Sequence, residues 1–193
     1  MDKKLLKLEL AGLLFCAACS AFMRSVYTLS GGSLPGLLFG AVNDSCWECC
    51  KTLLFSYLLW AVIEVMCLGR RVHRIAVAKT AALYALGVLY LGLCALYHGL
   101  DGKNTQAAEL AFAAVSVTLA FALSYALTVS PLKVERLFAP SLFLLFLLWS
   151  LYFSLTPFPV RNYLFMDRAT GMYGILPRNL DYGAVALDTI FVR

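Results

Sequence analysis

Residues 137–155 read LFAPSLFLLFLLWSLYFSL and contain no charged side chain. An α-helix needs about 20 apolar residues to cross the hydrocarbon core of a bilayer, so this run predicts a transmembrane helix. Pro157 and Pro159 follow the run and are expected to end the helix. The sequence therefore predicts an all-α fold, a polytopic membrane helical bundle with about five transmembrane helices. The four other apolar runs lie near residues 5–27, 45–68, 75–97 and 107–129.

The overall composition supports this fold class, because 62% of the 193 residues are hydrophobic and only 14% are charged. Soluble domains carry about 25% charged residues, so most classes of soluble enzyme are excluded. The net charge of +5 comes from short basic bursts between apolar runs, without the interleaved aromatic and basic residues of a nucleic-acid surface. The expected partner is therefore the lipid bilayer, and no nucleic acid is expected.

The chain divides into a transmembrane bundle over residues 1–156 and a tail over residues 157–193. The tail is too polar to span a bilayer and too short to bury a hydrophobic core of its own. We expect it to pack as a cap or lid on the extracytoplasmic mouth of the bundle. The first apolar run starts with basic residues as a signal peptide does, but its length favours a retained helix.

The distribution of basic residues predicts the orientation of the bundle, because cytoplasmic loops carry an excess of Lys and Arg. Nine of the sixteen Lys and Arg residues fall on one side of the five spans, and the short loops opposite carry only Lys51 and Lys103. We therefore expect a cell-membrane protein with a cytoplasmic N-terminus and an extracytoplasmic C-terminus. The nine residues are Lys3, Lys4, Lys7, Arg70, Arg71, Arg74, Lys79, Lys133 and Arg136.

The start of the second helix and the composition of the fourth carry further information. Ser45 and Glu48 have the spacing of a capping box, in which each side chain accepts a hydrogen bond from the backbone N–H of the other residue. Trp47 is expected at the depth of the membrane interface. The run 107–129 is rich in Ala and Ser, which allow helices to approach closely, so it is expected at the centre of the bundle.

Two stretches of the chain resemble known motifs. Residues 42–51 read VNDSCWECCK and residues 164–175 read LFMDRATGMYGI. They resemble the motifs VNxSxWExxxK and LFxDxxTGxYGI of an uncharacterised family, a domain of unknown function, of small bacterial polytopic integral membrane proteins. That family has His where this chain has Cys49, so a role that needs an imidazole there is not supported. The resemblance implies a membrane architecture and a shared site, but no activity.

Polar side chains near the extracytoplasmic ends of the helices suggest a small outward-facing cavity, because polar groups at that depth are costly unless paired or hydrated. The alternative is a set of interfacial charges that extend to lipid headgroups, with Glu48 acting only as a cap. The candidate ligand-binding residues are Asn43, Glu48, Lys51, His98, Asp167 and Tyr173, with Arg24, Glu109 and Arg168 at similar depth.

The seven cysteines offer a second kind of site. Cys46, Cys49 and Cys50 share one face at the start of a helix, and Cys94 lies one turn from His98. A Cys-x-x-Cys at a helix N-terminus favours the thiolate form that a redox pair or a metal site needs. We expect these thiols to be accessible from outside or paired in disulfides, with plain packing as the alternative. No cofactor or metal is assigned by the sequence.

Two glutamates lie nearer the cytoplasmic ends of the first two helices. Glu9 and Glu64 are expected to be boundary charges neutralised by Lys7 and by Arg70 or Arg71, and a proton relay is the alternative.

Three functions stay open. The favoured one is an outward-facing binding or transport module for a small polar molecule or a lipid headgroup. The alternative is an outer-leaflet membrane enzyme that uses Glu48 or His98 as acid or base, or Cys46 and Cys49 in thiol redox chemistry. In the favoured module, the small residues Ala17 and Ala21 would form a contact for a partner helix. The third function is a purely structural or immunity-type partner protein.

Overall fold

The computed structural model describes residues 2–69, 71–101 and 105–175. The described chain is helical apart from turns, loops and one isolated bridge between Met166 and Tyr173. In chain order, the helices are α1 (Asp2–Leu29), α2 (Leu34–Phe39), α3 (Cys46–Leu68), α4 (Val72–Asp101), α5 (Gln106–Val129), the 3₁₀ turn η1 (Val134–Leu137), α6 (Phe138–Leu155) and the 3₁₀ turn η2 (Tyr163–Phe165).

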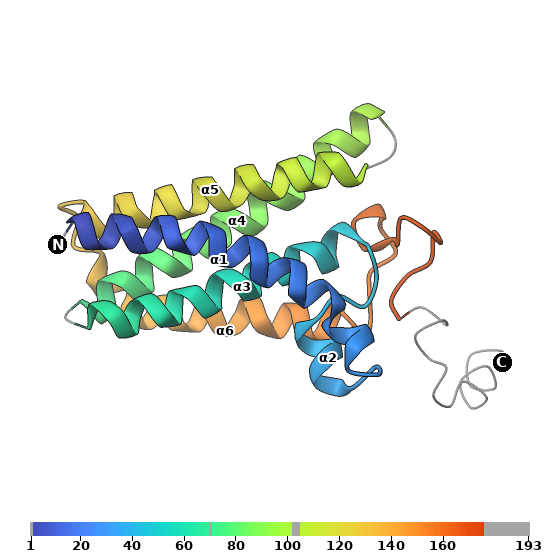
Figure 1. Ribbon diagram of the computed structural model, residues 1–193, viewed down its shortest axis with the longest axis horizontal. Coiled ribbons are helices and arrows are strands. Elements are labelled where there is room, and N and C mark those ends of the chain that lie inside the picture. The colour runs from blue at the N-terminus through green and yellow to red at the C-terminus, as the bar shows by residue number, and fades with distance from the viewer. Residues whose placement is uncertain (1, 70, 102–104, 176–193) are drawn as a thin grey trace.

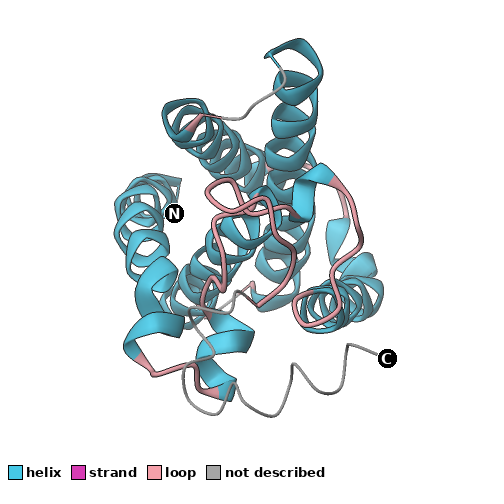
Figure 2. Ribbon diagram, turned by 90° about the vertical axis from the view of Figure 1, so that its right-hand side faces the viewer, coloured by secondary structure: helices cyan, strands magenta, loops and turns pink. Residues whose placement is uncertain are grey.

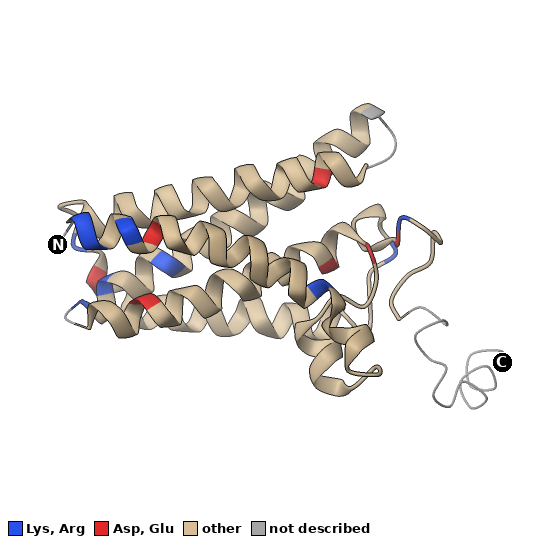
Figure 3. Cartoon of the chain, in the orientation of Figure 1, with Lys and Arg blue, Asp and Glu red and all other residues tan. Residues whose placement is uncertain are grey.

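Five of these helices are long and apolar enough to cross a membrane, which confirms the expected fold class and is compatible with a multi-pass membrane protein. The fifth span ends at Leu155, just before the two prolines. Figure 3 shows Lys, Arg, Asp and Glu gathered towards both ends of the long helices, with an uncharged stretch between them. Bulky apolar side chains face outward along this stretch, as lipid-facing residues do; they include Leu14, Phe143 and Phe146.

The short helix α2 was not predicted from the sequence. It has only six residues, with Ser33 as its N-cap and Pro35 in its first turn. Gly31 and Gly32 adopt φ angles of 62° and 75°, which favour glycine, and they reverse the chain between α1 and α2. A six-residue apolar helix has no hydropathy signature of its own, because the same letters read as the end of a longer run or as a loop.

The central helix is α3, and the expectation that residues 107–129 form the centre of the bundle was wrong. In the most apolar window of α3, 44% of the residues are buried, against 28% for α5 and 11% for α6. Figure 1 shows α1, α4 and α6 arranged around α3. The small residues of α5 allow close packing against α4 on one side, and on the other side they leave an open face that borders a cavity.

The bundle has two chemically distinct ends. The N-terminal end is where α1 begins; the opposite end, here called the tail end, holds α2, the start of α3 and residues 156–175. Figure 2 looks onto the tail end and shows its loops lying across the ends of the helices. Residues 163–165 contact α3 and α4 there, so this part of the tail packs on the bundle. The part of the expected cap beyond residue 175 lies outside the described residues.

Candidate functional site

A cavity of about 910 Å³ lies at the tail end of the bundle, between α1 and α5. Its floor is formed by α3 and by Tyr90 of α4, and loop residues Asp44, Arg168 and Ala169 border one end. Figure 1 shows α1 and α5 diverging towards this end of the molecule. The volume is within the range of about 300–1,000 Å³ that is typical of ligand pockets.

The charged lining residues gather at one end of this cavity. Arg24 of α1 donates a hydrogen bond from Nη2 to the Sγ of Cys49, at 2.6 Å. Glu109 of α5 forms an ion pair with Arg168, with Nη1 and Oε2 3.1 Å apart, and it accepts a hydrogen bond from the thiol of Cys46 at 3.3 Å. Arg168 also donates to the backbone oxygen of Asp44. The carboxylate of Glu109 is therefore paired with a cation, whereas the Arg24 guanidinium donates to a sulfur atom.

The rest of the cavity wall is made of small and apolar side chains. Ala17 and Ala21 of α1 face Ala113 and Ala114 of α5 across the opening. Ala17, Ala21 and Ala114 are also exposed at the surface of the bundle, so the cavity opens sideways between the two helices. The pair Ala17 and Ala21, expected to receive a partner helix, thus lines this opening instead of forming a flat contact surface.

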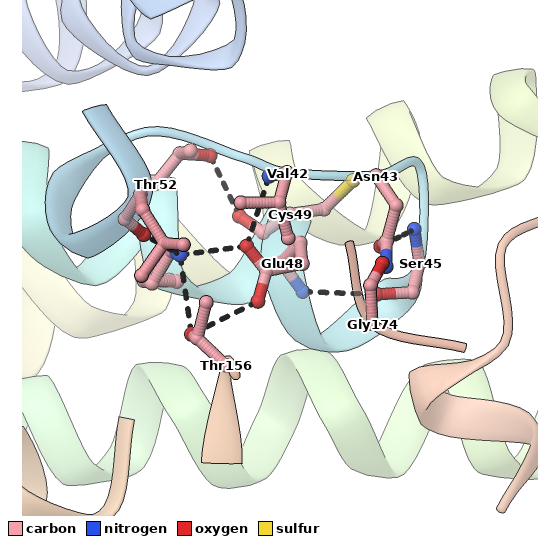
Figure 4. A network of polar contacts seen from close by, with 10 residues as sticks. Val42, Asn43, Ser45, Glu48, Cys49, Thr52, Thr156 and Gly174 are labelled. Carbon is pink, nitrogen blue, oxygen red and sulfur yellow. Dashed lines mark hydrogen bonds and ion pairs between the residues drawn. The ribbon is translucent and has the colours of Figure 1, made fainter. Parts of the chain in front are cut away.

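Glu48 and Lys51 form a buried ion pair within a network of polar contacts, and Figure 4 shows Glu48 in this network with Val42 and Thr156. The Lys51 Nζ lies 2.6 Å from Oε2 of Glu48, and their side chains are 0% and 3% exposed. Glu48 also accepts from the backbone N–H of Val42 and from the Thr156 hydroxyl, while Lys51 donates to the backbone oxygen of Leu37 and to Thr156. Neither residue lines the cavity, so the network joins α2, α3 and the end of α6.

The predicted capping box is formed only in half. Ser45 caps α3 by accepting from the backbone N–H of Glu48, as expected. The Glu48 carboxylate does not return to the N–H of Ser45, because it is held by Lys51, Val42 and Thr156. The N–H of Ser45 instead donates to Oδ1 of Asn43.

The two motif-like stretches, 42–51 and 164–175, meet at the tail end. The Asn43 side chain donates to the backbone oxygen of Gly174 at 2.8 Å, and the N–H of Asp44 donates to the carboxylate of Asp167 at 2.8 Å. Asp167 also accepts from the backbone and the hydroxyl of Thr170, which holds the loop in shape. Asn43 and Asp167 are buried, so both residues join the loop to the start of α3 rather than facing the cavity.

Aromatic residues complete this junction. Trp47 stacks on Tyr152 of α6 and on Phe165 of η2, with ring centroids 4.3 and 4.6 Å apart, so it packs between helix and tail. His98 stacks on Tyr163, with the ring planes 4° apart. Burial raises the pKa of the Tyr163 hydroxyl, which keeps it protonated at neutral pH. Tyr173 is 38% exposed and does not line the cavity.

The cysteines differ from the expectation, because Cys46, Cys49 and Cys50 are buried and none of the described cysteines forms a disulfide. Each of the three thiols contacts a different polar side chain, since Cys50 accepts a hydrogen bond from Tyr152 whereas Cys46 and Cys49 contact Glu109 and Arg24. Close packing of α3 against α1, α4 and α6 excludes them from the surface. No group of three or more metal-ligating side chains converges anywhere in the described residues.

The charges at the N-terminal end are also paired differently from the prediction. Glu9 and Glu64 both contact Lys79, not Lys7 or Arg71; Arg70, the other expected partner, lies outside the described residues. Lys79 was counted among the loop charges that set the orientation, but it is buried within α4. It therefore does not contribute to the basic surface at this end.

Of the polar residues expected at one depth, the structure brings Arg24, Glu109 and Arg168 to the cavity. Arg24 and Glu109 share one signal in the sequence, a charged side chain near the end of an apolar run, whereas Arg168 lies in the motif-like stretch 164–175 of the tail. Tyr90 was missed, because a tyrosine in the middle of an apolar span has no such signal. The candidate residues Asn43, Glu48, Lys51, Asp167 and Tyr173 lie around the cavity without lining it, and His98 lies beside η2.

Residues 2–175 match the model of a family of unknown function, DUF6512, so the chain belongs to that family. No curated protein and no solved structure matches the chain.

Proposed function

We propose that this member of the DUF6512 family binds or transports an amphipathic molecule with a single anionic head group, held in the cavity between α1 and α5. The observation that carries the proposal is the shape and polarity of that cavity. It has a guanidinium group at one end, small apolar residues along its length, and an opening on the side of the helix bundle.

The opening favours a ligand that comes from the bilayer. Ala17, Ala21, Leu110 and Ala114 border the cavity and are also exposed on the apolar flank of the bundle. An acyl chain placed against them would stay in apolar surroundings as it moves from lipid into the cavity. A purely polar solute would have to cross this apolar surface, so a lipid-like molecule fits better.

The charged end favours an anionic head group. Arginine binds carboxylate and phosphate oxygens with two parallel hydrogen bonds, and Arg24 is available for this because it donates to the sulfur of Cys49 and not to a carboxylate. Arg168 is compensated by Glu109, and the exposed Asp44 at the rim repels a second negative charge. The ligand class is therefore a carboxylate or a phosphodiester that carries one negative charge.

The alternative of an outer-leaflet enzyme finds less support in the placement of its candidate residues. Glu48 is buried and held by three partners, His98 stacks on Tyr163, and the Cys46 and Cys49 thiols contact charged side chains of the protein itself. A nucleophile, a base and an orienting group are not assembled among the described lining residues.

We further propose that the N-terminus is cytoplasmic and that the tail end faces outward, with the tail as its cap. The proposal rests on the basic residues of the N-terminal end, which outnumber those at the tail end even without Lys79. A reporter that is active only outside the cytoplasm should work when fused after Arg193. Activity of only a cytoplasmic reporter at that position would contradict this orientation.

The binding proposal is tested with purified protein in detergent and a pyrene-labelled fatty acid as the probe. Ala114→Phe should fill the apolar part of the cavity and Arg24→Gln should remove the head-group contact, each weakening binding about tenfold or more, or about 1.4 kcal/mol. Ala122→Phe is the matched control, because Ala122 is an exposed alanine of α5 outside the cavity lining. Equal binding by wild type and Ala114→Phe would overturn the proposal.

Competition separates the two head groups. Unlabelled fatty acid and phosphatidylglycerol are each added to the complex with the probe, and phosphatidylcholine serves as the zwitterionic comparison. The proposal expects displacement by at least one of the two anionic lipids and weaker displacement by phosphatidylcholine. Equal displacement by all three would contradict a role for Arg24 in head-group selection.

A further inference from the structure

A buried triad of charged side chains lies at the N-terminal end of the bundle, away from the cavity lining. Lys79 of α4 is placed between Glu9 of α1 and Glu64 of α3, with its Nζ 2.7 Å from one carboxylate oxygen of each. The three side chains are 5%, 4% and 0% exposed, respectively. The Lys79 ammonium also lies 5.3 and 4.9 Å from the ring centroids of Tyr57 and Phe121. The triad thus joins three of the five membrane-spanning helices in apolar surroundings.

The hydrogen bonds of the triad are incomplete. Glu9 accepts from the Ser124 hydroxyl at 2.9 Å through its other oxygen, Oε1. The corresponding oxygen of Glu64 is buried and has no hydrogen-bond partner among the described residues. The Tyr57 side chain, on the same helix as Glu64, is buried as well. An unsatisfied buried oxygen is costly, and here it lies at the triad on α3.

The charges of the triad do not balance, since two carboxylates face one ammonium group. The other titratable groups that face it are the Cys16 thiol of α1 and the Tyr57 hydroxyl of α3; α5 contributes the uncharged Ser124. Nearby cations are engaged elsewhere: Arg74 of α4 pairs with Glu135 and donates to backbone oxygens at the end of α5, and Lys4 donates to Cys67. With both acids ionised, the triad would hold one uncompensated negative charge in a medium that strongly disfavours it.

We propose that the triad is a proton-binding site, in which Glu9 and Glu64 together hold one exchangeable proton beside the Lys79 ammonium. A proton from water forms an O–H bond with a carboxylate oxygen, for which Glu64 Oε1 is the open position. No other bond is broken, the net charge of the triad changes from −1 to 0, and release returns the proton to water. The site does not depend on the proposed ligand cavity, because none of its residues lines that cavity.

The surroundings favour a proton over a metal cation. A metal ion needs several oxygen ligands, and Lys79 already occupies the position between the two carboxylates with a positive charge. The adjoining cavity of about 190 Å³ is lined mainly by aliphatic residues such as Leu58, Leu83 and Leu142. A proton requires only the free carboxylate oxygen.

The test is infrared difference spectroscopy of the full-length protein in detergent, between acidic and alkaline pH. In the wild type, the carbonyl stretch of a protonated carboxylic acid should appear as the pH falls through neutrality, and it should shift in heavy water. In Glu64→Gln, which mimics the protonated form, this band should be absent from the same pH range. Glu135→Gln is the control, because the Glu135 side chain is 44% exposed. A wild-type spectrum without such a band, or a band that both Glu64→Gln and Glu9→Gln retain, would overturn the proposal.

The stability of the wild type provides a second readout that needs no variant. In the unfolded chain, both glutamates lose their protons in the ordinary glutamate range, whereas the folded protein would keep one proton at higher pH. The free energy of unfolding should therefore fall as pH rises from about 5 to about 8. Glu64→Gln should flatten this slope, and Glu135→Gln should keep it. Equal slopes for wild type, Glu64→Gln and Glu9→Gln would contradict the proposal.

Discussion

Two buried clusters of glutamate and lysine lie at opposite ends of this bundle, and they differ in how their charges are matched. At the tail end, Glu48 and Lys51 are one acid and one base, and backbone and hydroxyl groups complete their hydrogen bonds. At the N-terminal end, Lys79 pairs with two acids, and one carboxylate oxygen of Glu64 has no partner in the part of the chain that the structure describes. The comparison teaches that similar residues, similarly buried, can form either a fixed junction or a site that exchanges a proton.

The largest expected effect comes from breaking the balanced cluster. Lys51→Met should leave the Glu48 carboxylate buried without a cation, which costs about 3–5 kcal/mol of folding free energy. The measurement is thermal unfolding of the detergent-purified protein. Lys133→Met is the control, because Lys133 is an exposed lysine in the α5–η1 connection. Equal melting temperatures for these two variants would show that the Glu48 cluster does not stabilise the fold.

A smaller loss is expected when the aromatic junction above that cluster is removed. Trp47→Ala deletes the stacking of Trp47 on Tyr152 and Phe165 and should cost about 3 kcal/mol. Because Phe165 lies just before Arg168, the same change should expose the loop to trypsin at Arg168. Trp47→Phe keeps an aromatic ring and should stay largely protected. Equal rates of trypsin cleavage in wild type and Trp47→Ala would contradict the role of Trp47 in holding the tail.

The smallest effects come from single hydroxyl groups, and they sharpen the comparison. Thr156→Val removes a donor to Glu48 and an acceptor of Lys51 in a complete network, and should cost about 1–3 kcal/mol. Ser124→Ala removes one donor to Glu9 in a network that is already incomplete, and should cost about 1 kcal/mol or less. Urea titration of both variants measures the difference. A larger loss for Ser124→Ala would reverse the proposed assignment of the two ends.

Much of the fold could be predicted from the sequence, because the length of an apolar run is a local property. The five spans and the stop after Leu155 follow from it. The pairing of charges could not be predicted in this way. Glu9 and Lys79 are 70 residues apart in sequence, and a lysine near one end of a helix looks like a loop charge until the helix is packed.

The candidate site could be predicted only in part, because it too depends on how distant segments pack together. Arg24 and Glu109 could be placed at one depth from their position in the apolar runs, and both border the cavity. The cavity itself depends on the divergence of α1 and α5, which no spacing of residues reveals. The position of Glu48 at N3 predicted a cap. Its carboxylate is instead held by Lys51, by the N–H of Val42 in the loop after α2 and by the hydroxyl of Thr156 at the end of α6.

The most direct test of the difference between the two ends is thermal unfolding of Glu48→Gln and Glu64→Gln beside wild type at neutral pH. Both changes remove one acid and keep its shape. Glu48→Gln should be less stable by about 3 kcal/mol, because it leaves the buried Lys51 without a counter-charge. Glu64→Gln should be as stable as wild type or more so, because Lys79 and Glu9 then form a balanced pair. Equal destabilisation by both changes would contradict the account.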